Sequence, residues 1–380
     1  MKKVAIISLP IGYNYGGQLQ TYALMEILRR NNYDVEFIMR KRVERCSLGS
    51  RIINKIKTFL EKIGLSTVVY LFEKKTNTGL FFKTAHIRRF QKEYICKISR
   101  TFYDTLALKE YCEIKRFDYY ICGSDQIWRR EYAPSFRNAF LDFAPHGAAK
   151  ISYAASLGID KWTYTEQETV EISNLLNEFK AISVRELSAI NLLNNNLKSL
   201  SDLQISHVLD PTLLLSKSDY LQIASKGVKR NGGILTYILE MDEKKRRGIA
   251  DFASFHKKEC FTIINPHTNE NKNIAIEQAY PVEDWLSGFR DAEYVLTDSF
   301  HACVFSIIFE KQFYVFENEK RGNSRLQDLL KIFGLENRFV DSNSFLFDKD
   351  EIDWEEVKKL KNKMQQESMF YLLNALDYDS

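Results

Sequence analysis

Short apolar runs alternate with helix-patterned segments along most of the chain, and this alternation limits the folds that the chain can adopt. The first apolar run, 3–9, is followed by a helical pattern over 18–31 and a second apolar run over 35–39. Strands separated by helices usually pair in parallel, because a right-handed crossover carries the chain back to the start of the next strand. The chain is therefore predicted to begin as a βαβ unit of an α/β fold.

Two consecutive series of such units predict two domains, since 380 residues exceed what one hydrophobic core usually organises. In the first series, further strands are expected at 118–122, 150–154 and 180–184, and helices at 165–177 and 186–194. In the second series, strands are expected at 207–209, 233–239, 260–264, 294–296 and 312–316, and helices near 217–224, 242–256, 282–289, 302–309 and 324–333. The pattern predicts two Rossmann-like, doubly wound domains that face a cleft.

The expected domain limits follow polar stretches of the chain. An N-terminal domain is placed at 1–203, because a polar stretch near 199–206 follows three asparagines. A C-terminal domain is placed at 204–345, and a charged helical tail at 346–380. The helix of this tail, 354–376, is expected to return to the first domain.

Positive charge gathers in one insert, 40–116. It holds 19 Lys and Arg against 7 Asp and Glu, although the whole chain carries only +4. Apolar residues are spaced along one face of a helix in this insert, at positions 52, 53, 56, 59, 60 and 63. A basic amphipathic segment suits an anionic membrane surface, so peripheral contact with the inner membrane is one expectation. A solvated helix pair packed on the domain is the alternative, and no nucleic-acid-binding module accompanies the charge.

Composition and hydropathy favour a cytoplasmic protein without a metal. No apolar run reaches about 18 residues, the length that a membrane-spanning helix needs. The apolar run 4–7 is too short for a signal peptide and is expected to be a first strand. The six cysteines are scattered without a C-x-x-C pair, so no zinc site is predicted.

A histidine follows one predicted strand, in the stretch Thr297-Asp298-Ser299-Phe300-His301. The pattern predicts a buried strand, a tight polar turn and a helix whose first turn carries His301. A helix N-terminus has unpaired N–H groups and a positive dipole end, so this place suits an anion. The alternative is an N-cap at Asp298 or Ser299, followed by a half-buried structural histidine.

Three more loops at predicted strand ends carry unusual residues. The loop 12–18 has two adjacent glycines that let a ligand approach the backbone, but it is not a dinucleotide-binding pattern; a tight turn is the alternative. Asp125 lies in the polar loop 122–128, where it would act as an acid or base, or cap the next helix. Arg185 would hold a phosphate or carboxylate, or form a salt bridge with Glu186 or another carboxylate.

These loops are expected to meet, because the carboxyl ends of parallel strands lie at one edge of a sheet. Arg325 begins another predicted helix, one strand after the histidine loop. Arg185, His301 and Arg325 together would form an anion site without a metal.

Five blocks of the sequence together resemble the polysaccharide pyruvyl transferase family. They are Asn14-Tyr15-Gly16-Gly17 with the following Leu19-Gln20 and Tyr22-Ala23-Leu24, then 123–128 (GSDQIW), 183–186 (SVRE), 209–212 (LDPT) and 297–301 (TDSFH). Their order and spacing match from about residue 3 to 340. The resemblance implies a GT-B-like fold with the active site between its two domains. It also implies transfer of the enolpyruvyl unit of phosphoenolpyruvate to two hydroxyls of one sugar, which gives a pyruvate ketal and phosphate.

The resemblance implies roles for individual residues. Arg185 and His301 match donor-binding positions, and His301 is also the expected proton donor. Asp125 is the expected general base toward the sugar hydroxyl. The residues expected on the acceptor side are Asn14, Tyr15, Gly16, Gly17 and Gln18.

One departure from the family concerns the donor. Many members have an arginine two residues before the histidine, where this chain has Ser299. The donor side is therefore expected to include Ser299, with the charge supplied by Arg325 or by a neighbour at 320 or 321. Phosphoenolpyruvate is expected as a co-substrate, with no cofactor.

The expected function is pyruvyl transfer in bacterial capsule or exopolysaccharide synthesis, with an acceptor sugar that a lipid carrier holds. One alternative is a GT-B glycosyltransferase that uses a nucleotide sugar, although no strong nucleotide fingerprint is present. Another is a non-catalytic subunit that binds a glycan or a lipid carrier. Ser299 favours this last alternative, whereas Asp125, Arg185 and His301 argue against it.

Overall fold

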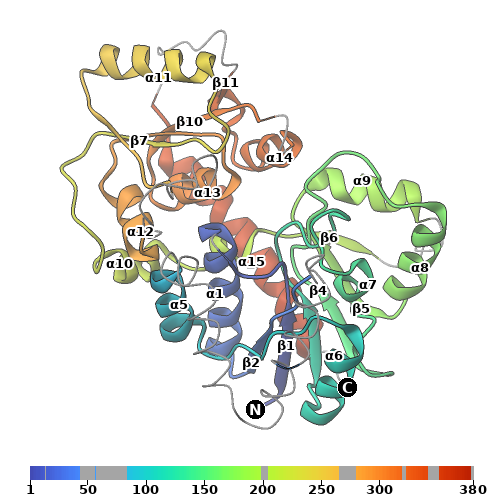
Figure 1. Cartoon of the computed structure of the whole chain (residues 1–380). Coiled ribbons are helices and arrows are strands. Elements are labelled where there is room, and N and C mark those ends of the chain that lie inside the picture. The colour runs from blue at the N-terminus through green and yellow to red at the C-terminus, as the bar shows by residue number, and fades with distance from the viewer. Residues whose placement is uncertain are drawn as a thin grey trace.

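The computed structural model describes residues 1–12, 14–42, 56, 84–197, 204–264, 280–318, 322–340 and 351–377. Within these ranges, the chain forms two parallel sheets with helices packed around them (Figure 1). The first sheet has the order β2-β1-β3-β4-β5-β6, and the second has the order β11-β10-β9-β7-β8. This confirms the predicted α/β class with two parallel sheets.

Continuous apolar runs form the strands, because parallel strands are usually covered on both faces. In β3, for example, all four residues are buried. The first sheet contains β1 (Lys3–Ile7), β2 (Asp34–Ile38), β3 (Tyr119–Cys122), β4 (Ala149–Ser152), β5 (Phe179–Val184) and β6 (Ile205–His207). The second contains β7 (Ile234–Tyr237), β8 (Cys260–Phe261), β9 (Tyr294–Thr297), β10 (Gln312–Phe316) and β11 (Phe339–Val340).

Helices connect the strands in both parts of the chain. Those in the first part are α1 (Tyr15–Arg30), α5 (Ala85–Phe90), a π-helical turn (Gln91–Ile95), α6 (Thr105–Lys115), α7 (Phe136–Ala139), α8 (Glu166–Leu176) and α9 (Leu187–Asn196). A 3-10 turn (Pro211–Leu214) then precedes α10 (Lys217–Ala224), α11 (Glu243–His256), α12 (Val282–Asp291), α13 (Phe300–Ile308), α14 (Ser324–Ile332), a second 3-10 turn (Glu336–Arg338) and α15 (Trp354–Asp377). All nine residues of α13 are buried, so its apolar sequence forms a central core helix.

One predicted strand joins a different sheet from the one expected. The run 207–209 was expected to open the second series, but the strand is β6, Ile205–His207, and it pairs with β5 of the first sheet. Its three residues are only partly buried, and a short edge strand carries no pattern that tells which sheet it joins. The chain therefore leaves the first sheet after His207.

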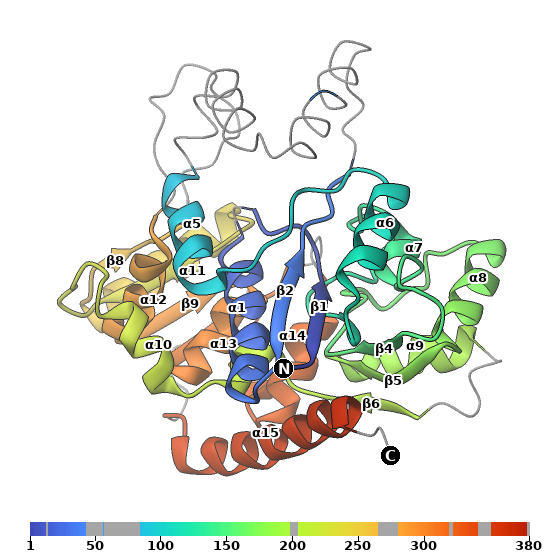
Figure 2. The same cartoon turned by 90° about the horizontal axis from the view of Figure 1, so that it is seen from below.

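The C-terminal helix returns to the first sheet, as expected. Tyr371 on α15 donates a hydrogen bond to the Ser152 carbonyl of β4 at 2.9 Å. The Tyr119 hydroxyl of β3 bonds the Leu376 carbonyl. Figure 2 shows α15 along one side of the molecule, past elements of both sheets. Helix α15 therefore bonds the first sheet and also runs beside elements of the second.

Most of the basic insert lies outside the described residues. The expected amphipathic helix face at 52–63 lies there, apart from Ile56. Its proposed contact with a membrane stays a prediction. Along the ranges that the structure describes, no helix is long and apolar enough to cross a membrane.

Candidate functional site

The loops after several strands bring their polar residues together. Asp125 follows β3, Arg185 follows β5, and Asp210 lies beyond β6 at the start of a 3-10 turn. His301 is the second residue of α13 and comes after β9 of the other sheet. Its Nε2 lies 3.6 Å from Asp210 Oδ2, and Arg185 Nη1 lies 2.8 Å from the same oxygen. The carboxyl ends of strands from both sheets therefore meet, as the parallel arrangement predicts.

Arg185 is buried among three carboxylates. Its Nη1 donates to Asp210, its Nη2 lies 3.8 Å from Asp125 Oδ1, and its Nε lies 3.8 Å from Glu186 Oε2. The guanidinium carbon also lies 4.2 Å from the centre of the Phe300 ring. A guanidinium stays charged when buried, and these contacts confirm the predicted salt bridge with Glu186 or another carboxylate. The role of Arg185 in holding a phosphate or carboxylate stays a prediction.

Asp210 is the site residue to which the sequence assigned no role. Its side chain is fully buried, and Oδ1 accepts hydrogen bonds from the backbone N–H and the hydroxyl of Thr212 at 3.0 and 2.7 Å. Burial by itself would raise the pKa of Asp210, but the His301 ring and the Arg185 guanidinium outweigh it and hold the pKa well below its ordinary range. The signal in the sequence was an aspartate between two apolar residues in the block 209–212.

His301 is confined between Asp210 and the first turn of α1. Only 7% of the residue is exposed, and a Cβ placed on Gly16 would overlap the ring at Nδ1 and Cγ. A side chain at position 16 would therefore displace the histidine. The absence of a side chain at Gly16 therefore allows another group to lie close to the backbone, as predicted. The prediction named a ligand, whereas the group found there is the His301 side chain from the second part of the chain.

Neither expected cap of α13 uses its side chain for that purpose. Ser299 occupies the N-cap position without a side-chain cap bond. Asp298 is buried, and its Oδ1 accepts from Leu239 N at 2.6 Å. Its Oδ2 lies 3.0 Å from Lys245 Nζ. Asp298 therefore fixes the loop after β7, which corrects its predicted role as a possible N-cap.

Asp125 has a left-handed backbone, with φ of 72°. Its Oδ1 accepts a hydrogen bond from Gln126 N at 2.9 Å, so the side chain stabilises its own turn. The next helix, α7, begins only at Phe136, which excludes the expected alternative of a helix cap. A strained residue with a buried carboxylate beside Arg185 is typical of functional sites.

Arg325 lies in the first turn of α14 and reaches the same region. Its guanidinium carbon is 5.7 Å from the centre of the Phe300 ring, which Arg185 also contacts. The predicted group of Arg185, His301 and Arg325 is therefore brought together around Phe300. Positions 320 and 321, the other predicted sources of positive charge, lie outside the described residues.

The five residues predicted for the acceptor side differ in exposure. Asn14 is exposed, whereas the next four residues are buried. Tyr15 stacks on Trp285 with ring centres 5.6 Å apart, and its hydroxyl donates to the Tyr280 carbonyl at 2.8 Å. The Gln18 side-chain amide donates to the Gly12 carbonyl at 2.8 Å. Of this group, Asn14 alone is placed to reach a ligand from solvent, and the acceptor assignment stays a prediction.

Three buried side-chain atoms of this cluster lack a hydrogen-bond partner among the described residues. They are Arg185 Nε, Glu186 Oε2 and His301 Nε2. Each of them lies 3.6 or 3.8 Å from an oppositely charged group, beyond hydrogen-bond distance. Leaving such an atom without a hydrogen bond costs about 1–3 kcal/mol, so the cluster retains unused hydrogen-bonding capacity. Among all the residues that the structure describes, no group of three or more His, Cys, Asp or Glu residues is arranged to hold a metal.

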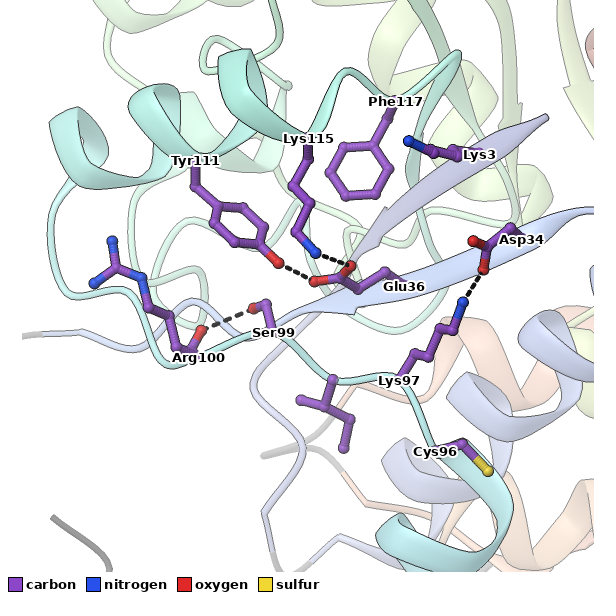
Figure 3. A pocket seen from close by; sticks show the side chains of 11 residues that line it. Lys3, Asp34, Glu36, Cys96, Lys97, Ser99, Arg100, Tyr111, Lys115 and Phe117 are labelled. Carbon is purple, nitrogen blue, oxygen red and sulfur yellow. Dashed lines mark hydrogen bonds and ion pairs between the residues drawn. The ribbon is translucent and has the colours of Figure 1, made fainter. Parts of the chain in front are cut away.

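Two of the pockets that the described residues form lie elsewhere on the molecule. One, of about 380 Å³, is lined by residues of β2, α6 and the segment 96–100, and Figure 3 shows Lys97 directed at Asp34 and Lys115 directed at Glu36. Lys97 pairs with Asp34, and Lys115 Nζ lies 3.4 Å from Glu36 Oε2. The other, of about 640 Å³, lies between β6 and α15. None of the residues predicted for the site lines either pocket.

Comparison with solved structures supports the GT-B-like fold. UDP-GlcNAc 2-epimerase from Methanocaldococcus jannaschii is 12% identical, covers 100% of both chains and has a TM-score of 0.53. UDP-GlcNAc 2-epimerase from Neisseria meningitidis, bound to UDP-GlcNAc, is 9% identical, also covers 100% of both chains and has a TM-score of 0.55. At these identities the likeness concerns the fold alone.

Comparison by sequence identifies the family. No curated protein matches the chain. A family model described as polysaccharide pyruvyl transferase matches residues 14–320, which include all five motif blocks and every residue of the cluster around Arg185 except Arg325. The chain belongs to the polysaccharide pyruvyl transferase family.

Proposed function

We propose that the protein transfers the enolpyruvyl unit of phosphoenolpyruvate to two hydroxyls of one sugar, as a pyruvate ketal of a bacterial capsule or exopolysaccharide. The observation that carries this proposal is the buried cluster of Arg185, His301 and Asp125, with unpaired polar atoms on the first two. Phosphoenolpyruvate has a phosphate and a carboxylate, so it needs several cations and N–H groups close together. The N-terminal turns of α13 and α14 supply such groups beside these side chains.

The hydrogen bonds that Arg185 makes within the protein indicate which residues would contact the donor. Each Nη atom of Arg185 donates one hydrogen bond to a protein group, Asp210 or Ser156, and Nε has no hydrogen-bond partner, so we propose that Nε contacts the donor. Arg325 lies across the same Phe300 ring and would supply the second positive charge. We therefore propose that Arg325 takes over for the arginine that Ser299 replaces.

Asp125 and His301 would move protons during the reaction. The first sugar hydroxyl passes its proton to Asp125 and bonds to C2 of the enolpyruvyl unit, while His301 protonates the methylene carbon. The C2–O bond to phosphate then breaks, and phosphate leaves with the electron pair. The second hydroxyl bonds to the resulting oxocarbenium carbon and releases its proton. One released proton restores His301 and the other accompanies phosphate, so the reaction balances without a cofactor.

Donor binding is tested by thermal unfolding. We expect phosphoenolpyruvate to raise the melting temperature of the wild-type protein, because a ligand that binds only the folded state stabilises it by about 2.7 kcal/mol at a hundred times its Kd. Pyruvate and UDP-N-acetylglucosamine serve as matched small-molecule controls. A shift with the nucleotide sugar but none with phosphoenolpyruvate would contradict the proposal and favour the glycosyltransferase alternative.

We further propose that the acceptor is linked to a lipid carrier and that the protein works at the cytoplasmic face of the membrane. The support is the excess of Lys and Arg in the insert 40–116. Each basic residue near an anionic surface contributes about 1 kcal/mol, and salt screens this attraction.

Vesicle binding tests this second proposal. We expect the protein to co-sediment with anionic vesicles at low salt, and not at high salt or with neutral vesicles. Changing Arg51, Lys55, Lys57 and Lys62 together to glutamate should remove the binding. Wild-type protein that ignores anionic vesicles at low salt would indicate a soluble acceptor.

A further inference from the structure

One oxygen of Asp210 contacts both cationic groups of the proposed site. Oδ2 accepts a hydrogen bond from Arg185 Nη1 at 2.8 Å and lies 3.6 Å from His301 Nε2. The Ser124 hydroxyl donates to the same oxygen at 3.1 Å. Because Thr212 bonds the other oxygen twice, both oxygens are engaged within the protein. Asp210 therefore has little capacity left to bond a substrate, and any effect on the reaction passes through its neighbours.

The negative charge of Asp210, and not only its shape, affects the two cationic side chains beside it. A protonated His301 beside a permanently charged Arg185 would be repelled, because both positive groups lie close to one oxygen atom inside the protein. An ionised carboxylate between them removes this repulsion. The low pKa of Asp210 agrees with a carboxylate that stays ionised despite complete burial.

We propose that Asp210 is a positioning residue, which orients the His301 ring and fixes the direction of the Arg185 side chain. This inference rests on the proposed function, in which His301 gives a proton to the methylene carbon of the donor. Asp210 neither bonds the donor nor takes up the transferred proton. Its ionised oxygen lies 3.6 Å from Nε2, beyond hydrogen-bond distance, so this nitrogen stays available to the donor, while Gly16 limits the ring on the side of Nδ1. The ring is thus held in one orientation by a charge on one side and a helix backbone on the other.

The test compares Asp210→Asn with wild type in phosphoenolpyruvate-dependent transfer. Asparagine keeps the shape and can still accept the Arg185 hydrogen bond, but it carries no charge. We expect kcat to fall by about 10²- to 10⁴-fold, the usual contribution of a proton-transfer group. We expect the KM for phosphoenolpyruvate to change little, because Asp210 is itself an anion and attracts no donor. A merely structural role would weaken donor binding and turnover together.

A double-substitution cycle shows whether Asp210 acts through His301. In a His301→Gln background, Asp210→Asn should cause almost no further loss of kcat, because residues that act as a unit are strongly non-additive. Asp291→Asn is the matched control, since the Asp291 carboxylate pairs with Arg290 and accepts from Arg230 N, and neither of these residues belongs to the proposed site. It should leave kcat unchanged.

A milder variant covers the case in which Asp210→Asn does not fold. Thr212→Val removes the hydroxyl that holds Oδ1 and nearly preserves volume. It should lower kcat by roughly tenfold at unchanged KM, as expected for one charge-assisted hydrogen bond. Unchanged kcat in Asp210→Asn would overturn the inference. If only Thr212→Val folds, unchanged kcat in that variant would overturn it. Additive losses of kcat in the double-substitution cycle would overturn it as well. Wild-type protein without turnover would instead overturn the proposed function.

Discussion

Replacing Asp125 with asparagine should reduce pyruvyl transfer by about 10²- to 10⁴-fold and leave phosphoenolpyruvate binding nearly unchanged. The amide has the size of the carboxylate but cannot accept the sugar proton. The backbone of residue 125 is left-handed, a conformation that asparagine tolerates better than most residues. The amide oxygen can also keep the bond from Gln126 N, so the turn should persist.

The measurement for Asp125 is kcat beside the donor-induced shift in melting temperature. Asp104→Asn is a matched control, because Asp104 caps α6 and asparagine is an equally good cap. The control should match wild type in both quantities. Near-normal turnover of Asp125→Asn would show that Asp125 only stabilises its turn.

Replacing Gly16 with alanine should lower kcat by about a hundredfold or more without unfolding the protein. The added Cβ would overlap the His301 ring, so the histidine must shift, and small misplacements of catalytic groups cost about 10²-fold. Helix stability should not suffer, since alanine favours a helix by up to about 1 kcal/mol over glycine. A lower kcat at an unchanged melting temperature would therefore show that Gly16→Ala affects the activity and not the folding.

The adjacent glycine provides the control for Gly16. A Cβ on Gly17 would lie 3.7 Å from its nearest neighbours, atoms of the Asn14 side chain, which is ordinary van der Waals contact. Gly17→Ala should therefore keep the wild-type melting temperature and the donor-induced shift in melting temperature, because its methyl group does not meet His301. If both variants retain full activity, His301 does not need its observed position and its assignment as proton donor is wrong.

Local patterns predicted most of the elements. Both ends of α10, Lys217–Ala224, match the prediction, because a serine cap precedes a short amphipathic segment. The start of α1 was predicted at 18, yet the helix begins at Tyr15. Two glycines are weak helix formers, and the packing of Tyr15 on Trp285 stabilises that first turn. This contact joins distant parts of the chain, so no local pattern carries it.

The site was predictable as separate loops but not as a connected cluster. Arg185, His301 and Asp125 were predictable because each follows a predicted strand, and open α/β sheets bind ligands at the carboxyl ends of their strands. The role of Asp210 depends on contacts with residues from both parts of the chain, which no spacing in the sequence shows. The need for glycine at position 16 likewise arises from a side chain almost three hundred residues away. Such pairings depend on how the two sheets are placed relative to each other.

The measurement that tests the central claim most directly is acceptor-dependent release of phosphate from phosphoenolpyruvate. Wild-type protein would be incubated with phosphoenolpyruvate and a panel of hexose and N-acetylhexosamine glycosides, both free and lipid-linked, and the sugars analysed by mass spectrometry. We predict phosphate release only with an acceptor, and an equal amount of sugar that carries one pyruvate ketal. Consumption of a nucleotide sugar, with phosphoenolpyruvate left intact across the panel, would contradict the proposed function.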